Sequence, residues 1–170
     1  MPQKIIPFIL GPLANNSFLI IDQATQQAAV IDPTFDSDAI LSYAKHNNIH
    51  ITHILFTHAH FDHIAGVDAI ADHLQPAPII ALHPADLQLW QAQGYAANFG
   101  ITLTLHSSPN LWVQQDQIIQ IGATQIQVRF TPGHCAGHVV YYLQESKVVF
   151  CGDLIFREGV GRTDLPGGSH

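Results

Sequence analysis

The segment THAHFDH, residues 57–63, places three histidines and an aspartate within seven positions, directly after the apolar run HILF. Burying such groups together is costly, because each loses its hydration and like charges repel one another. His58 and His60, two positions apart, project to the same side of an extended turn, and Asp62 and His63 begin the next element. Imidazole and carboxylate are ligands that zinc or iron accepts, so we expect a metal site. The competing interpretation makes Asp62 only a helix N-cap.

The sequence around this segment predicts an α/β fold. Short apolar runs bounded by Gly, Pro, Asn or Asp predict strands. They are KIIPFIL (4–10), SFLIID (17–22), QAAVID (27–32), HILFT (53–57), PIIALH (78–83), IIQI (118–121), QIQVRF (125–130), VVYYL (139–143) and KVVFCGD (147–153). Capping residues and apolar stripes predict helices over 36–47, 63–74 and 84–91. This order predicts one domain over residues 1–170, with helices covering sheets.

Composition excludes several classes of partner. The formal charge is −7, with 6 Lys+Arg and no cluster of them, which argues against nucleic acid and anionic membrane surfaces. No apolar run approaches the roughly 20 residues that span a bilayer. Two cysteines do not make a disulfide framework, and Pro7 and Pro12 interrupt the apolar N-terminal run. Without a signal peptide, we expect a cytoplasmic protein.

Two further segments bear on the metal site. TPGHCAGH (131–138) puts His134 in a Pro-Gly turn between two predicted strands. FCGDLIF (150–156) puts Asp153 at a strand end, where a carboxylate can bridge two cations. Taken singly, His134 could be structural and Asp153 could merely end a strand. With a cluster already needing ligands, we interpret both as ligands.

THAHFDH, TPGHCAGH, FCGDLIF and GVGRTDLPGG (159–168) together resemble the metallo-β-lactamase fold superfamily, and more narrowly its glyoxalase II-like branch of hydroxyacylglutathione hydrolases. The resemblance implies a four-layer αββα sandwich. It also implies one or two Zn²⁺ ions per chain, with iron as an alternative. The implied ligands are His58, His60 and His134 for the first metal, Asp62 and His63 for the second, and Asp153 between them.

The sequence departs from that family at its end. The family has a further histidine ligand beyond the bridging aspartate, whereas this sequence ends 17 positions after Asp153. We therefore expect the last strand and closing helix to be lacking. His170, in a Gly-rich terminus, is a poor substitute ligand. Metal content should then be nearer one ion per chain than two.

The implied reaction is hydrolysis of a glutathione-type thioester, such as S-lactoylglutathione, by a metal-bound hydroxide. Asp62 would also orient that hydroxide. Arg162, in the GVGRTD segment, would contact the acidic thiol carrier, or could make a structural salt bridge instead. The expected partner is a small-molecule thioester, and the oligomeric state stays open.

Two alternatives remain from the sequence. Persulfide dioxygenases share these motifs but use one iron and oxygen on glutathione persulfide, which suits a chain with an incomplete second site. The other alternative is a catalytically impaired fragment that binds one metal without turnover. β-Lactamase activity is disfavoured by the lack of an export signal, and nuclease activity by the acidic charge balance.

Overall fold

Six strands form the larger sheet, in the order β1-β2-β3-β4-β5-β6, in a computed structural model that describes residues 3–169. The strands are β1 (Gln3–Leu10), β2 (Asn15–Asp22), β3 (Gln27–Ile31), β4 (His50–Leu55), β5 (Ile79–Leu82) and β6 (Leu111–Trp112). The first three pair antiparallel, whereas β3 to β6 run parallel because the intervening chain crosses back before each new strand. β3 is buried along nearly all its length, as is typical of a strand covered on both faces.

The smaller sheet has four antiparallel strands in the order β10-β9-β8-β7. They are β7 (Ile118–Ile121), β8 (Thr124–Phe130), β9 (Val139–Leu143) and β10 (Val148–Phe150). β7 alternates exposed and buried residues, and β8 does so over most of its length, so one face packs inward and the other faces solvent.

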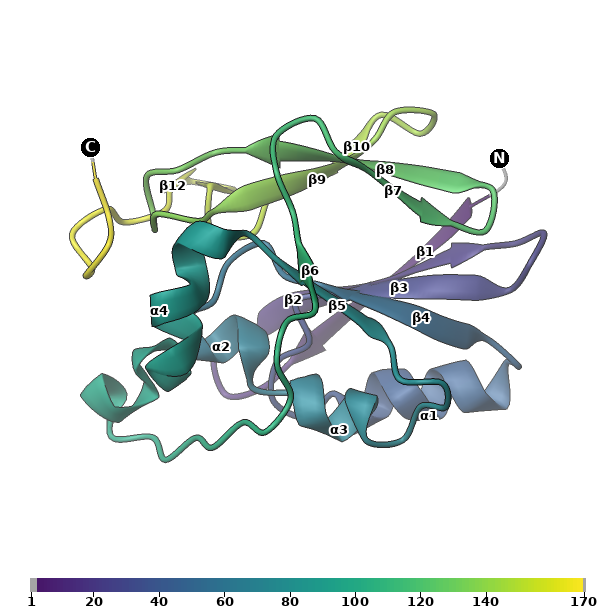
Figure 1. Cartoon of the computed structure of the whole chain (residues 1–170), viewed down its shortest axis with the longest axis horizontal. Coiled ribbons are helices and arrows are strands. Elements are labelled where there is room, and N and C mark those ends of the chain that lie inside the picture. Colours follow the sequence, from purple (N-terminus) through teal and green to yellow (C-terminus); the bar gives the residue numbers. More distant parts are fainter. Residues whose placement is uncertain (1–2, 170) are drawn as a thin grey trace.

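Helices cover the outer face of the larger sheet (Figure 1). They are α1 (Asp38–His46), α2 (Phe61–Ile64), α3 (Val67–Ala71), the 3₁₀ turn η1 (Pro84–Asp86), α4 (Leu87–Gln91) and η2 (Gln93–Phe99). One apolar core lies between these helices and the sheet, and a second lies between the two sheets. The predicted α/β fold is therefore confirmed. Residues 3–169 form the two sheets and the helices on the larger sheet. Within this range no helix covers the outer face of the smaller sheet, where the closing helix of the four-layer sandwich was expected to be lacking.

One predicted helix is wrong in extent. The stripe over 63–74 predicted a single helix, but the structure has α2 and α3 separated at Gly66. The Gly66 N–H donates to Pro33 O at 2.9 Å. A Cβ at Gly66 would lie 2.0 Å from Thr34 O, so only glycine allows this approach. The tertiary contact ends the first helix.

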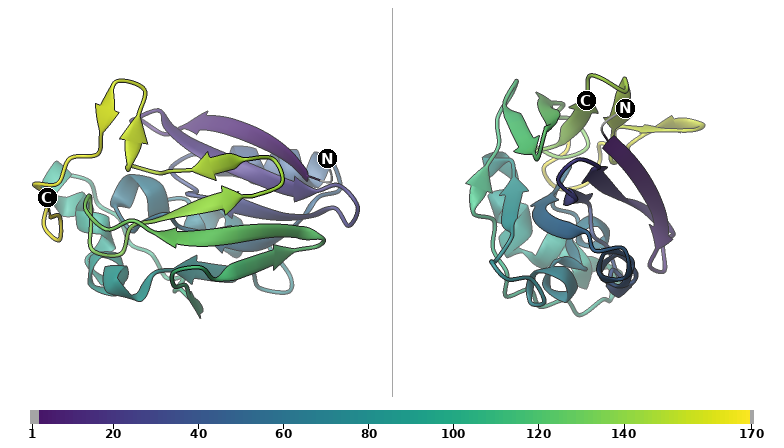
Figure 2. Two further views of the ribbon diagram at one scale, coloured as in Figure 1. Left: turned by 90° about the horizontal axis from the view of Figure 1, so that it is seen from above. Right: turned by 90° about the vertical axis from the view of Figure 1, so that its right-hand side faces the viewer.

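The segment after Asp153 contains two further short strands. Residues Ile155–Phe156 (β11) and Gly159–Val160 (β12) pair as a small antiparallel hairpin. Figure 2 shows this hairpin projecting away from the two main sheets. His170, weighed above as a substitute ligand, lies outside the described residues. Within residues 3–169, no helix combines the length and apolarity needed to cross a membrane.

Candidate metal centre

The loop after β4 carries two of the predicted ligands, and Asp32 fixes how that loop leaves the sheet. Asp32 follows β3, and its two carboxylate oxygens accept hydrogen bonds from Thr57 N at 2.7 Å and Thr57 Oγ1 at 2.6 Å. His58 comes next and is fully buried. His60 is extended, with φ −67° and ψ 149°, and α2 starts directly after it. The strand end therefore sends both imidazoles into the interior.

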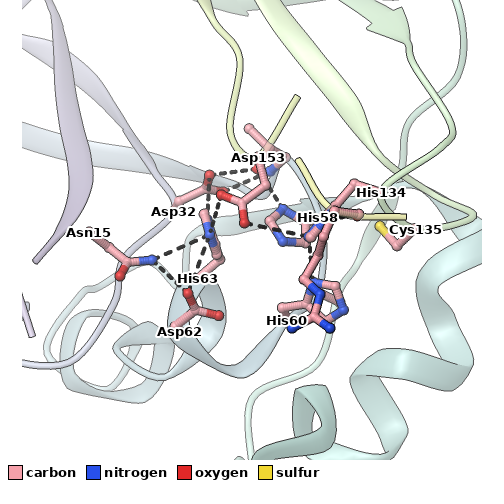
Figure 3. A network of polar contacts seen from close by, with 12 residues as sticks. Asn15, Asp32, His58, His60, Asp62, His63, His134, Cys135 and Asp153 are labelled. Carbon is pink, nitrogen blue, oxygen red and sulfur yellow. Dashed lines mark hydrogen bonds and ion pairs between the residues drawn. The ribbon is translucent and has the colours of Figure 1, made fainter. Parts of the chain in front are cut away.

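His58, His60 and His134 form the first group of candidate ligands. One nitrogen from each lies within 4.8 Å of the others, although His134 comes from the distant loop between β8 and β9. His60 Nδ1 and His134 Nε2 are 2.8 Å apart (Figure 3). The three imidazoles therefore converge as the sequence predicted.

His58, His63 and Asp153 form a second group, again within 4.8 Å. Asp153 reaches both groups, because Oδ1 lies 3.1 Å from His63 Nε2 and Oδ2 lies 3.5 Å from His134 Nε2. Asp62 lies beside His63, with Oδ2 3.7 Å from His63 Nε2. All six residues predicted as ligands thus belong to one cluster, and Asp153 contacts a histidine of each group.

The electrostatics of the cluster favour a bound cation. Burial, with the neighbouring histidines, lowers the pKa of His58 well below its usual value and that of His60 to about 4. Both imidazoles are therefore neutral at pH 7, which is the form in which an imidazole can bind a metal. Among the described residues, His58 Nε2 is buried without a hydrogen-bond partner, and it is the nitrogen left for the cluster because His58 Nδ1 faces Thr57 Oγ1. Such an atom is costly in an interior unless something coordinates or solvates it, so the cluster fits a metal ion.

His63 behaves differently from the other imidazoles. Burial alone would lower its pKa, but hydrogen bonds to Asp153 and Asp32 raise it well above the usual value. The same His63 contact lowers the pKa of Asp153 against the effect of burial. The carboxylates of Asp153 and Asp32 therefore favour the protonated form of His63.

The outward-facing ring nitrogens are held by protein groups. His63 Nδ1 lies 3.0 Å from Asp32 Oδ2, and His134 Nδ1 lies 2.7 Å from Arg162 O. His58 Nδ1 is 3.1 Å from Thr57 Oγ1. Contacts of this kind select the tautomer and orient the ring, leaving the other nitrogen for the cluster.

A cleft of about 410 Å³ opens onto the cluster. Its apolar lining includes Leu13, Phe99 and Phe156. Arg162 also lines it, but its guanidinium makes two 2.7 Å contacts with the Asp164 carboxylate. The salt-bridge alternative for Arg162 is therefore present in the structure, whereas its contact with a thiol carrier stays a prediction.

A family model described as the metallo-beta-lactamase superfamily matches residues 10–170. The chain belongs to the metallo-beta-lactamase superfamily. "Probable metallo-hydrolase YqgX" of Bacillus subtilis is 34% identical, over 94% of this chain and 75% of the relative. A hydroxyacylglutathione hydrolase of Francisella tularensis subsp. novicida is 31% identical, over 91% of this chain but only 52% of the relative. The resemblance inferred from the motifs is confirmed.

Solved structures of this superfamily agree with the fold. The B3 metallo-beta-lactamase BLEG-1 has a TM-score of 0.89 at 32% identity, covering 98% of this chain and 80% of BLEG-1. TTHA1623, solved in a di-iron-bound form, has a TM-score of 0.84 at 34% identity, covering 96% of this chain and 79% of TTHA1623.

Three residues of the site have no role in the sequence analysis. Asp32 holds His63, and the strand-end position that singled out Asp153 could have found it. Asn15 donates from Nδ2 to Asp62 Oδ2 at 2.9 Å, and no sequence pattern marks it. Asp86 lies against both ligand loops. Its position depends on tertiary structure alone.

Proposed function

We propose that the chain is a metal-dependent hydrolase that cleaves thioesters. The observation that supports this most is the pair of ligand groups, one of three imidazoles and one with a carboxylate that reaches both. A divalent cation held there acidifies water and polarises a carbonyl oxygen, which is the chemistry that thioester hydrolysis needs.

Each ligand has a proposed place. His58, His60 and His134 would hold the first cation, Asp62 and His63 the second, and Asp153 would serve both. The set suits Zn²⁺ and also iron, since both accept imidazole and carboxylate. Asp62, positioned by Asn15, would orient the attacking water with its carboxylate.

The proposed substrate is a glutathione-type thioester such as S-lactoylglutathione. The similarity to the Francisella hydroxyacylglutathione hydrolase supports this class, although the chain spans about half of that relative's length. The apolar side of the cleft would shield the reacting carbonyl from bulk water. Arg162 would contact the acidic carrier by exchanging its Asp164 partner for a substrate carboxylate.

The decisive experiment measures hydrolysis of S-lactoylglutathione by the chelator-stripped chain before and after zinc addition. We expect activity only after zinc is added. His58→Ala should reduce it at least about 100-fold because a buried ligand is lost. His50→Ala, at an exposed position, is the matched control. Zinc-dependent cleavage of a β-lactam without thioester cleavage would instead assign the activity suggested by BLEG-1.

An iron-dependent oxygenase acting on glutathione persulfide is the second candidate. The similarity to ETHE1 from Myxococcus xanthus, a persulfide dioxygenase, favours it, with a TM-score of 0.76 at 26% identity over 98% of this chain and 64% of ETHE1. Oxygen uptake by the iron-loaded chain with glutathione persulfide would establish this activity. A chain that binds metal yet shows neither oxygen uptake nor hydrolysis would be the impaired fragment considered above.

A further inference from the structure

Asp86 connects the two loops that carry the first group of candidate ligands. Its side chain is buried, with the residue 1% exposed. One carboxylate oxygen, Oδ2, accepts from Ala59 N and from Cys135 Sγ, each at 3.1 Å. The other, Oδ1, accepts from Gly137 N at 2.6 Å. Ala59 lies between His58 and His60, and the other two donors follow His134.

The three donated hydrogen bonds replace the hydration that this carboxylate loses on burial. Across residues 3–169, no Lys, Arg or His forms an ion pair with Asp86. Burying a carboxylate costs several kcal/mol unless hydrogen bonds replace its hydration. The two loops must therefore stay close enough to supply all three donors, so the carboxylate restrains the distance between them.

The loop that carries His134 approaches Asp86 closely at Gly137. A Cβ at Gly137 would lie 2.6 Å from both Asp86 Cγ and Asp86 Oδ1. Only glycine lets the backbone reach the carboxylate at this position. Because the fit is close, a small shift of Asp86 would move the backbone three residues after His134.

Asp86 is held in place by the 3₁₀ turn η1 and by the helix that follows it. It ends η1, where its N–H donates to His83 O at 3.0 Å. The following helix, α4, packs Trp90 against Phe56, with ring centroids 5.2 Å apart, and Phe56 directly follows β4. The helix that follows Asp86 is therefore packed against the core next to the end of β4, the strand that precedes the ligand loop.

We propose that Asp86 is a positioning residue for the metal centre: it sets the separation of the His58–His60 loop from the His134 loop. The separation that it maintains places His60 Nδ1 2.8 Å from His134 Nε2. This inference rests on the proposed metal-binding function and adds a residue that contacts no substrate. A merely structural role would stabilise the chain without affecting metal affinity.

Asp86→Asn breaks one of the two backbone contacts. Ala59 N and Gly137 N donate to different carboxylate oxygens, and neither can accept a hydrogen bond. The amide NH₂ of the variant must face one of them, whereas the Cys135 thiol can donate or accept. In either orientation the side chain therefore loses its hydrogen bond to one of the two loops.

Asp22→Asn is the matched control. Asp22 is also fully buried and bridges two segments, accepting from Thr25 Oγ1 at 2.8 Å and from Thr124 Oγ1 at 3.0 Å. Asp22 is the last residue of β2, whereas Asn15, which contacts Asp62, is the first, so Asp22 lies at the end of the strand away from the site. Any general cost of altering a buried carboxylate should affect both variants.

The test measures zinc affinity by competition with a chromophoric chelator, and the visible spectrum of the Co²⁺ form, in folded parent and variants. We expect Asp86→Asn to bind zinc about 10- to 100-fold more weakly and to change the Co²⁺ spectrum, with Asp22→Asn matching the parent in both. Parental zinc affinity in Asp86→Asn would overturn the inference while leaving the proposed function intact. A parent chain that binds no zinc would overturn both.

A second pair of variants covers the case in which Asp86→Asn does not fold. Cys135→Ala removes one donor to Asp86, whereas Cys135→Ser retains one. We expect Cys135→Ala to weaken zinc binding several-fold and Cys135→Ser to restore most of the loss. Equal affinities in both variants and the parent would contradict the positioning role.

Discussion

Asp32 shows how one side chain can determine both stability and site geometry. It accepts two hydrogen bonds from Thr57 and one from His63 Nδ1, all within the interior. The first two direct the ligand loop, and the third orients an imidazole of the second group. We therefore expect Asp32 to contribute more to the free energy of unfolding than a carboxylate at the surface does.

Asp32→Ala should lower the free energy of unfolding by about 3 kcal/mol, because it leaves buried donors of Thr57 and His63 unsatisfied. Urea denaturation of the metal-free chain measures this. Asp38→Ala, at an exposed position in the first turn of α1, should cost less than about 1 kcal/mol. Equal losses in the two variants would contradict the structural role of Asp32.

At the scale of elements, short helices are positioned by tertiary contacts rather than by their own propensity. α2 has four residues and α3 has five, which is too short for stability in isolation. Gly66 separates them by binding Pro33, and the resulting break leaves Asp62 and His63 on a single turn beside the cluster.

Gly66→Ala should destabilise the chain by about 1–3 kcal/mol, since the new Cβ would lie 2.0 Å from Thr34 O. Thermal unfolding measures the loss. Gly159→Ala serves as the control, because a Cβ there meets no atom within 4 Å. If both substitutions lower Tm by the same amount, steric exclusion at Gly66 is not the cause.

A second element-scale contact ties the irregular segment after η2 to α3. His106 Nδ1 lies 3.1 Å from Asp68 Oδ2, and its Nε2 lies 3.0 Å from both Asp72 oxygens. Hydrogen bonding to Asp72, with the charges of Asp68 and Asp72, raises the pKa of His106. The folded state thus favours protonated His106, so this stabilisation is full below the ordinary pKa and is lost as pH rises through the raised one.

His106→Gln should therefore lower Tm more at about pH 5.5 than at about pH 8.5. Thermal melts of parent and variant at the two pH values give the difference directly. His50→Gln, exposed at the start of β4, is the control. A Tm loss in His106→Gln that is the same at both pH values would refute the ionic contact.

At the scale of the whole molecule, the packing of two sheets brings the ligand loops together. Tyr141 on β9 is fully buried between them, and its hydroxyl donates to Phe56 O at 2.9 Å. That hydrogen bond links the smaller sheet to the residue just before the ligand loop. It is one of the contacts by which sheet packing controls the site.

Tyr141→Phe should reduce the free energy of unfolding by about 1–2 kcal/mol, because a buried carbonyl loses its donor while the ring still packs. Chemical denaturation is again the measurement. Tyr142→Phe, half-buried on the same strand, should change stability by less than about 0.5 kcal/mol. A larger loss from Tyr142→Phe than from Tyr141→Phe would contradict this account of the inter-sheet contact.

The sequence alone determined the fold class, most strands, and the set of candidate ligands. Apolar periodicity encodes strands locally, and the closely spaced polar groups in THAHFDH require compensation wherever they are buried. The break at Gly66 and the roles of Asn15, Asp32 and Asp86 were decided only by tertiary structure. Each depends on atoms that are distant in sequence and meet only in the folded chain, and no local sequence pattern predicts such a contact.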